Sequence, residues 1–91
     1  LFLKLCKNKK VLHIGACDSP YTKEKLKRGL LLYKKIDKVA QEQLGIDLDK
    51  TSIQYLNKLK EFKNSSIKHF NMNKISELKF KPAIIFVDFT F

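Results

Sequence analysis

The stretch "VLHIGACDSPYT", Val11 to Thr22, decides the fold of this chain. It opens as a mostly apolar run and reaches a glycine at Gly15, which is typical of a buried parallel strand that ends in a tight turn. The further glycines of a dinucleotide-binding loop do not follow, because the chain continues as "ACDSP". We therefore predict a strand over residues 11–16 and, over 17–29, a polar loop with room for a short helical turn.

The rest of the chain alternates between helical and strand-like patterns. Apolar residues at steps of three and four predict a helix over 30–44, with Gly45 placed just past its end. A second helix is predicted over 50–62, with Asp49 as its N-cap. Short runs of β-forming residues predict three further strands over 46–49, 67–71 and 83–91, with 72–81 as a connection.

This order of elements predicts an α/β fold. Ninety-one residues make at most one small domain, so residues 1–91 are treated as one. Strands that alternate with helices predict a parallel sheet with right-handed crossovers and a ligand site at its carboxyl edge. The run over 83–91 is apolar at nearly every position, which is typical of a strand covered on both faces. We expect the chain to continue in the native protein, so that this is its N-terminal part.

Composition narrows the classes of function. The formal net charge of +10 raises the question of a nucleic-acid partner. Eighteen of the nineteen basic residues are lysines spread along the chain, whereas arginine is preferred for bidentate recognition of phosphates and bases. Ordinary surface charge is therefore the preferred interpretation, and an anionic partner stays an alternative.

The cysteines and the hydropathy pattern point to a cytoplasmic protein. Cys6 and Cys17 match neither a disulfide framework nor a metal-ligand spacing, so we expect no metal site. No apolar run approaches the roughly 18 residues that a membrane span requires. No signal-peptide pattern opens the chain, so we expect a cytoplasmic protein without a membrane partner.

Four short motifs fall at the ends of the predicted strands, where an α/β sheet builds its site. They are "VLHIGA", "GIDLD", "FNMNKI" and "PAIIFVDF", which start at Val11, Gly45, Phe70 and Pro82. In this order they resemble the motifs of the class I, Rossmann-like S-adenosylmethionine-dependent methyltransferases. The resemblance covers residues 9–91.

The resemblance implies a three-layer Rossmann-like sheet with parallel strands in the order 3-2-1-4 and crossover helices, as an incomplete part of the family's seven-stranded fold. It implies an enzyme that transfers a methyl group from S-adenosyl-L-methionine to an acceptor, and it identifies neither the acceptor nor the catalytic residues. The cofactor-binding residues that it implies are Gly15, Ala16, Cys17, Asp47, Leu48, Asn71, Met72 and Asp88.

Most of these positions have a specific implied role. The backbone N–H groups of residues 15–17 would approach the methionine part of the cofactor. Asp47 would accept hydrogen bonds from both ribose hydroxyls, which suits one bidentate carboxylate. Asn71 would accept from the adenine amino group with Met72 packed beside the ring, and Asp88 would sit where the floor of the site meets the substrate.

Simpler interpretations stand beside these roles. Asp47 can also be interpreted as a solvated carboxylate at the end of a strand, and Asn71 can be interpreted as a turn residue. We interpret Asp49 as an N-cap, His13 as a packed strand histidine and His69 as a surface residue.

The chain also departs from the family pattern. His13 stands where the first motif usually has an acid, and Cys17 stands where a glycine usually lies, as does Ser19. Asp47 follows Gly15 by 32 positions, against about 20 in the dinucleotide fingerprint. The excess matches the insert "SPYTKEKLKRGL", whose role the sequence does not explain.

Two other functions stay open. A sulfonium cofactor needs no pyrophosphate cradle, so the missing glycines favour S-adenosylmethionine over a dinucleotide. A NAD(P)-dependent oxidoreductase with Asp47 on the adenine ribose is the second candidate. The third is a non-catalytic Rossmann-like module that binds an anionic partner through its lysines.

Overall fold

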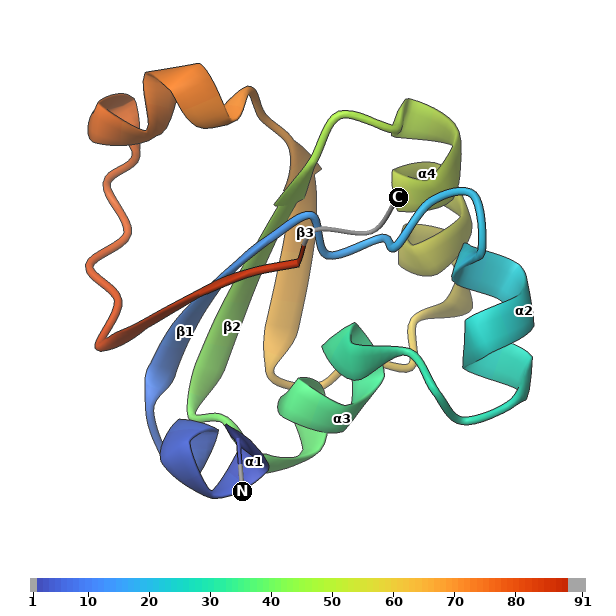
Figure 1. Cartoon of the computed structure of the whole chain (residues 1–91), viewed down its shortest axis with the longest axis horizontal. Helices are drawn as coiled ribbons and strands as arrows, with labels where there is room; N and C mark the ends of the chain where they lie inside the picture. Colours follow the sequence, from blue (N-terminus) through green and yellow to red (C-terminus); the bar gives the residue numbers. More distant parts are fainter. Residues whose placement is uncertain (1, 89–91) are drawn as a thin grey trace.

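A four-stranded, all-parallel sheet forms the centre of the computed structural model, which describes residues 2–88 (Figure 1). The strands are β1 Lys10–Ile14, β2 Glu42–Asp47, β3 Ser65–His69 and β4 Ile84–Val87. Their order across the sheet is β3-β2-β1-β4. The predicted α/β fold with parallel strands in the order 3-2-1-4 is therefore confirmed.

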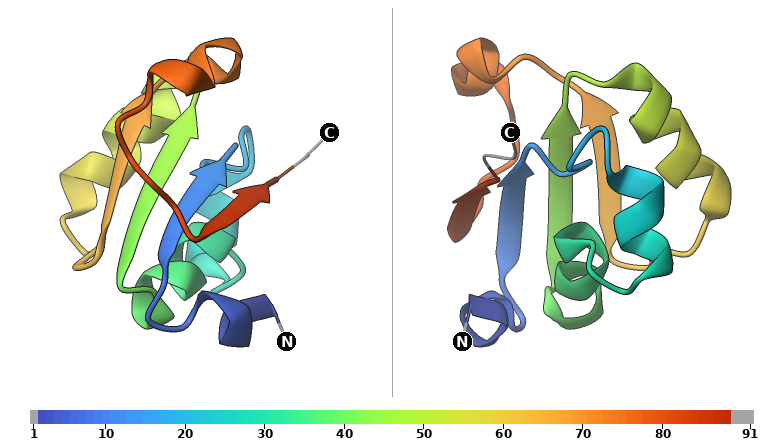
Figure 2. Two further views of the ribbon diagram at one scale, coloured as in Figure 1. Left: turned by 90° about the vertical axis from the view of Figure 1, so that its left-hand side faces the viewer. Right: turned by 45° about the vertical axis from the view of Figure 1, so that its right-hand side comes forward.

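The first helix precedes the first strand, the other helices lie between the strands in sequence, and the helices form the outer layers. They are α1 Phe2–Cys6, α2 Thr22–Lys27, α3 Leu32–Val39, α4 Lys50–Leu59 and the 3-10 helix η1 Met72–Glu77. Figures 1 and 2 show α2, α3 and α4 on one side of the sheet, and η1 with the segment after it on the other. Right-handed crossovers explain this division, because the step from β3 to β4 runs back across the sheet, opposite to the two earlier steps.

Strand β1 supplies side chains to both faces of the sheet. Val11 is fully buried and packs against Ile36 and Ala40 from the α3 side, together with Cys6 of α1. Leu12 points to the opposite face and is also buried. A second cluster fills the space beneath α4 and the loop after β1; its buried members are Ala16, Cys17, Leu31, Tyr33, Ile53, Leu56 and Ile67.

The structure corrects the predicted helix over 30–44 and the role of Gly45. Helix α3 ends at Val39, and β2 begins at Glu42, so the predicted strand over 46–49 starts four residues too late. Gly45 lies inside β2, where an added Cβ would lie 2.9 Å from the Ala16 Cβ. Residue Gln43 falls at a helical step of the pattern that predicted the helix over 30–44. In the structure its polar side chain is fully buried in β2, so this step did not indicate a helix.

Other boundaries shift by smaller amounts. Strand β3 begins two residues before the predicted 67–71, and α4 is shorter than the predicted 50–62. The segment predicted as a connection contains η1, and α1 was not predicted. Strand β4 covers Ile84–Val87 of the predicted 83–91, and residues 89–91 of that prediction lie outside the described residues.

Two local predictions are confirmed. Asp49 is the N-cap of α4, and its side chain accepts hydrogen bonds from the N–H groups of Thr51 and Ser52. The loop after β1 contains the expected short helix, α2. Over residues 2–88 the structure shows no helix long and apolar enough to cross a membrane.

Candidate functional site

A cavity of about 360 Å³ opens at the carboxyl ends of β1, β2 and β4, next to η1. This volume lies within the range of small-molecule sites. The cavity sits where the chain connections change direction across the sheet, between β1 and β4, which is the usual ligand position in open α/β sheets. The lining residues are Ile14, Gly15, Ile46, Asp47, Leu48, Phe70, Asn71, Met72, Asn73, Val87 and Asp88.

Six of the eight residues implied by the sequence resemblance line this cavity. They are Gly15, Asp47, Leu48, Asn71, Met72 and Asp88. The other two, Ala16 and Cys17, do not line it, because their side chains are buried in the core. The chain therefore brings together residues from four segments that are distant in sequence.

The apolar wall of the cavity was not among the predicted site residues. It consists of Ile14, Ile46 and Val87 from three adjacent strands, with Phe70 from the segment before η1. Side chains along a strand alternate between the two faces of the sheet, and these three residues point to the face opposite the one that α2, α3 and α4 cover. This alternation along each strand was the sequence signal from which the apolar wall could have been predicted.

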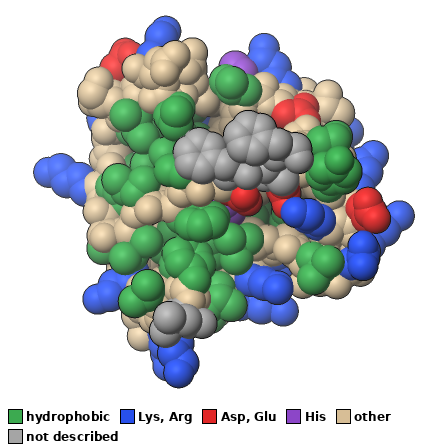
Figure 3. Space-filling view, viewed as in Figure 1, with side chains coloured by type: hydrophobic (Ala, Val, Ile, Leu, Met, Phe, Trp, Pro, Cys, Tyr) green, Lys and Arg blue, Asp and Glu red, His purple; other side chains and the backbone are tan. Residues whose placement is uncertain are grey.

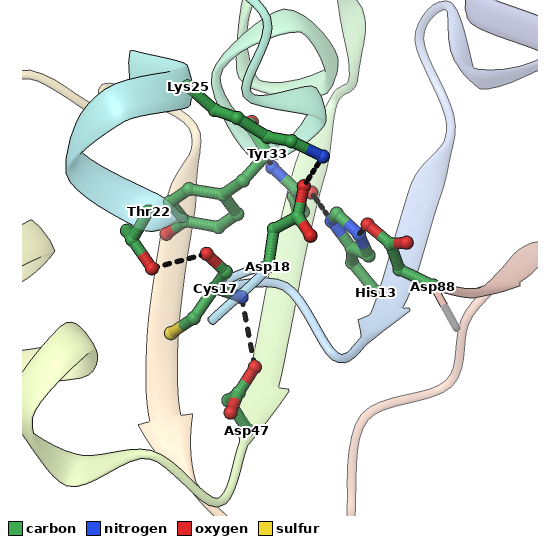
Figure 4. Close-up of polar contacts among 9 residues, drawn as sticks. His13, Cys17, Asp18, Thr22, Lys25, Tyr33, Asp47 and Asp88 are labelled. Atoms are coloured by element: carbon green, nitrogen blue, oxygen red, sulfur yellow. Dashed lines mark hydrogen bonds and ion pairs between the residues drawn. The ribbon is translucent and has the colours of Figure 1, made fainter. Parts of the chain in front are cut away.

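The turn at Gly15 uses its backbone N–H groups within the protein. The N–H groups of Gly15 and Ala16 both donate to the Ile46 carbonyl oxygen, at 2.9 and 3.3 Å. The Cys17 N–H donates to Asp47 Oδ2 at 3.0 Å (Figure 4). The contact of these three groups with a cofactor stays a prediction, and it would require the present bonds to be shared or exchanged.

Asp47 is held in a fixed orientation at the end of β2. Its Oδ2 accepts from the Cys17 N–H, and its Oδ1 accepts from the Asp49 N–H at 3.0 Å. An ionised carboxylate has about four lone-pair positions, so each oxygen keeps capacity for one more donor. Asp47 can therefore accept two neighbouring hydroxyl groups while it keeps the turn in place.

Two exposed apolar side chains stand at the mouth of the cavity. Leu48 is 63% exposed and follows Asp47, and Met72 is 46% exposed at the start of η1. Asn71 caps η1, and its side-chain oxygen accepts from the Asn73 N–H at 2.9 Å. Its interpretation as a turn residue is therefore confirmed, and its role toward a ligand stays a prediction.

The insert after β1 fastens the turn to its surroundings. The Thr22 hydroxyl donates to the Cys17 carbonyl oxygen at 2.6 Å, and the Ser19 hydroxyl donates to Asp49. Lys25 of α2 binds the buried Asp18 carboxylate (Figure 4). These contacts give residues 18–29 a structural role that the sequence did not reveal.

Hydrogen bonds and burial change three of the local pKa values. Hydrogen bonds lower the pKa of Asp49 below its ordinary value. The bond that Ser19 donates has the largest effect, and the bond that Ser52 donates has the second largest. Burial, and then the charges of Asp47 and Asp49, raises the pKa of the Cys17 thiol. The hydrogen bond to Asp18 raises the pKa of Lys25. Cys17 is therefore a core thiol and not a nucleophile.

The two histidines have the predicted environments. His69 is exposed at the end of β3. His13 is fully buried, and its Nδ1 lies 2.9 Å from the Gln43 side-chain oxygen. Among residues 2–88, no three His, Cys, Asp or Glu side chains gather in a way that could hold a metal ion.

The surface around the site is mixed in character. Figure 3 shows basic side chains, Lys and Arg, around the outline of this face and apolar side chains across its middle. Comparison of the chain with models of known protein families and with curated proteins gives no match. The cavity and the sequence motifs are therefore the features of this chain that point to a function.

Proposed function

We propose that this chain binds S-adenosyl-L-methionine in the cavity at the carboxyl edge of the sheet and forms the cofactor-binding part of a methyltransferase. The carrying observation is the position of Asp47, an oriented carboxylate with spare acceptor capacity that lines the cavity between Gly15 and Leu48. When bound, the cofactor supplies a methyl group on a positively charged sulfur. The methyl acceptor is not identified by the residues described.

Asp47 suits the ribose of this cofactor. Two adjacent hydroxyl groups offer two donors at a spacing that a single carboxylate can accept. The two backbone N–H groups that bind Asp47 hold it in place before a ligand arrives. This orientation lowers the entropy that binding would otherwise cost.

Leu48 and Met72 suit a flat aromatic base. Both are apolar, exposed and part of the cavity lining, so burying them under a ring would be favourable. Asn71 lies next to Met72 and carries an amide that can pair with the edge of an adenine.

The turn at Gly15 argues against a dinucleotide. A pyrophosphate site relies on backbone N–H groups that point freely at the anion. Here the N–H groups of Gly15, Ala16 and Cys17 already have protein acceptors. S-adenosylmethionine carries no phosphate and needs no such cradle, although the predicted contact of these N–H groups with its methionine part would require the present bonds to be shared or exchanged.

Titration calorimetry on the full chain tests the proposal. We expect S-adenosylhomocysteine to bind with micromolar affinity and NADH to bind at least tenfold more weakly. Tighter binding of NADH would favour the oxidoreductase instead. If neither cofactor binds and RNA binds in a salt-sensitive way, the non-catalytic module with an anionic partner is favoured.

Matched variants locate the binding. Leu48→Ala and Met72→Ala remove exposed side chains, so the fold should be retained while affinity falls roughly 5- to 20-fold for each, as expected from lost apolar burial. Asp47→Ala should reduce affinity more, with circular dichroism to check the fold. Glu42→Ala removes an exposed carboxylate from the other end of β2 and should leave affinity unchanged.

A further inference from the structure

A second cavity lies on the face of the sheet that α2, α3 and α4 cover. It has a volume of about 460 Å³, and residues of all three helices line it. We call it the lysine groove, because its lining includes Lys27, Lys34, Lys35 and Lys38. In the described part of the chain it shares no lining residue with the cavity at the carboxyl edge of the sheet, so the two sites are separate.

The lysines of the groove carry an excess of positive charge. Glu61 is the one carboxylate in the described lining, and its Oε2 lies 3.1 Å from the Lys34 ammonium nitrogen. The other three lysines are exposed, and their side chains have no acidic partner among residues 2–88. Three ammonium groups around one concavity repel each other, and a bound anion would relieve this repulsion.

The other acidic side chains of these helices do not offset this charge. Glu24 of α2 lies 3.7 Å from Arg28, so these two exposed groups offset each other. Asp37 of α3 is buried and accepts from backbone N–H groups of the loop before β3. Lys23 adds a positive charge beside the groove, since its ammonium nitrogen lies 5.0 Å from the centre of the Tyr55 ring. The groove is therefore a region of net positive potential.

The floor of the groove is apolar. Leu26, Tyr55 and Leu59 line it, are half-buried and pack against the buried cluster beneath α4. Gly29 contributes no side chain, and a Cβ there would meet nothing within 4 Å, so the groove stays open at this point. A partner that fits the groove must offer negative charges and flat or apolar groups together.

This combination favours one kind of anionic partner. Apolar side chains reach the interior of a membrane only where they protrude, whereas those of the groove are recessed between helices. A nucleic-acid duplex keeps its bases stacked inside, so it offers little to an apolar floor. A single strand offers phosphates and the open faces of its bases together, and lysines beside an aromatic ring suit both.

We propose that the lysine groove binds single-stranded nucleic acid. The phosphates lie against Lys27, Lys35 and Lys38, and an unpaired base lies on the floor formed by Tyr55 and Leu59. No arginine lines the groove in the described part of the chain, so it lacks the fork of donors that reads individual bases, and the binding is independent of base sequence. Because the groove is separate from the cofactor cavity, this binding does not depend on the proposed function.

Fluorescence anisotropy on the full chain tests the groove, with a labelled oligouridylate of about ten nucleotides as the probe. We expect binding that weakens as the salt concentration rises, because counterions are released from the phosphates. A stable duplex of the same length should bind at least roughly threefold more weakly, because its bases cannot reach the floor. No binding of oligouridylate at low salt, or equal or tighter binding of the duplex, would overturn the proposal.

A combined variant removes the unpaired charges of the groove. It carries Lys27→Gln, Lys35→Gln and Lys38→Gln, which replace exposed side chains, and circular dichroism checks that the fold is retained. At low salt its affinity for oligouridylate should fall roughly tenfold or more. The slope of log affinity against log salt concentration should become shallower by about 2, since each lost phosphate contact on a single strand contributes about 0.7.

A charge-matched variant is the control. It carries three substitutions of exposed lysines on η1 and the segment after it, on the other side of the sheet, namely Lys74→Gln, Lys79→Gln and Lys81→Gln. Its net charge equals that of the groove variant, and its affinity should change less than about threefold. Equal losses in the two variants would show that binding follows net charge alone, which would contradict the assignment to the groove.

Tyr55 tests the apolar floor separately from the lysines. Tyr55→Leu keeps an apolar side chain in the floor and removes the ring, so affinity should fall roughly fivefold while the salt slope stays the same. Tyr55→Phe keeps the ring and should retain the affinity. An unchanged affinity in Tyr55→Leu would exclude a base on the floor. If Tyr55→Leu does not fold, the two lysine variants still decide whether the groove binds the strand.

Other ligands complete the test. We expect neither polyglutamate nor S-adenosylhomocysteine to displace oligouridylate. Displacement by polyglutamate at the same concentration of charge would overturn the proposal in favour of an acidic protein partner. Phosphatidylserine vesicles that bind through the groove lysines, without binding of oligouridylate, would overturn it in favour of a membrane. If no cofactor binds, the proposed function fails, and the oligouridylate results still decide the role of the groove.

Discussion

Gly15 lies directly against the backbone of Asp88. A Cβ built on Gly15 would lie 2.6 Å from the Asp88 carbonyl oxygen, and Gly15 has a φ of +78°. The glycine therefore serves two needs at once: a left-handed backbone conformation and the close approach of the first turn to the last described strand. Both are structural requirements that hold with or without a ligand.

The first prediction concerns Gly15→Ala. The left-handed conformation alone costs a residue with a Cβ about 1–2 kcal/mol, and a backbone oxygen cannot move aside as a flexible side chain can. We expect the free energy of unfolding to fall by about 2–4 kcal/mol, which is in the range of severe single substitutions. Urea denaturation followed by circular dichroism measures the change.

Gly29→Ala is the matched control for this substitution. Gly29 also has a positive φ, +70°, but a Cβ there would meet nothing within 4 Å. We expect a loss of about 1 kcal/mol from the backbone conformation alone. An equal loss for both variants would show that the contact with Asp88 contributes nothing.

A second prediction concerns Asp37, which anchors the loop before β3. The Asp37 carboxylate is buried and accepts from the Asn64 N–H at 2.9 Å, the Lys63 N–H at 3.3 Å and the Ser65 hydroxyl at 2.8 Å. Asp37→Asn replaces one acceptor oxygen with a donor that faces other donors. We expect a loss of about 1–3 kcal/mol in the free energy of unfolding, as for an unsatisfied buried group.

The control for Asp37 is an exposed carboxylate with a lysine partner. Glu61 and Lys34 form an ion pair at 3.1 Å in which the glutamate is 48% exposed. Such pairs contribute about 0–1 kcal/mol, so Glu61→Gln should change stability little. A comparable loss in both variants would contradict the anchoring role of Asp37.

The parallel sheet and the position of the site at its carboxyl edge were predictable because they rest on local patterns, whereas the strand order was predicted from the family resemblance. A buried strand ending at Gly15, and polar residues Asp47, Asn71 and Asp88 at strand ends, mark the carboxyl edge of a parallel sheet. Parallel strands bring those ends together whatever the details of the loops. The cavity therefore follows from the order of the elements.

The end of α3 and the start of β2 were not predictable in the same way. Gln43 falls at a helical step, and its role depends on His13, Ser65 and the Tyr33 carbonyl, which are distant in sequence. The bond from the Cys17 N–H to Asp47 likewise spans 30 positions. Spacing patterns carry no information about such long-range pairing, so the occupied N–H groups of the turn were missed.

A third prediction concerns the pH dependence of stability through Asp49. Its pKa in the folded chain lies below the ordinary value of 3.8, because Ser19 and Ser52 donate to the ionised carboxylate. A lowered folded-state pKa contributes stability that is present above the unfolded value and is lost as pH falls through the folded value. We expect the free energy of unfolding to decrease below about pH 4.

Asp49→Asn isolates this contribution. Asparagine is also a good N-cap, so α4 should persist, while the titrating carboxylate is removed. The difference in unfolding free energy between the unmodified chain and the variant should shrink between pH 6 and pH 3. A constant difference over that range would exclude Asp49 as the source.

The last prediction concerns the reactivity of the two thiols. Cys6 and Cys17 are both free and buried, and burial raises the pKa of each. The thiolate is the reactive form, so a disulfide reagent at pH 8 should react with the native chain far more slowly than with a free thiol. In urea the chain unfolds and exposes both thiols, so both should react rapidly. Ser66→Cys places a thiol at an exposed position of β3 and should react rapidly in the native chain. Rapid reaction of the unmodified chain, at a rate similar to that of Ser66→Cys, would mean that the packing around Cys6 in α1 or the turn at Cys17 opens readily in solution.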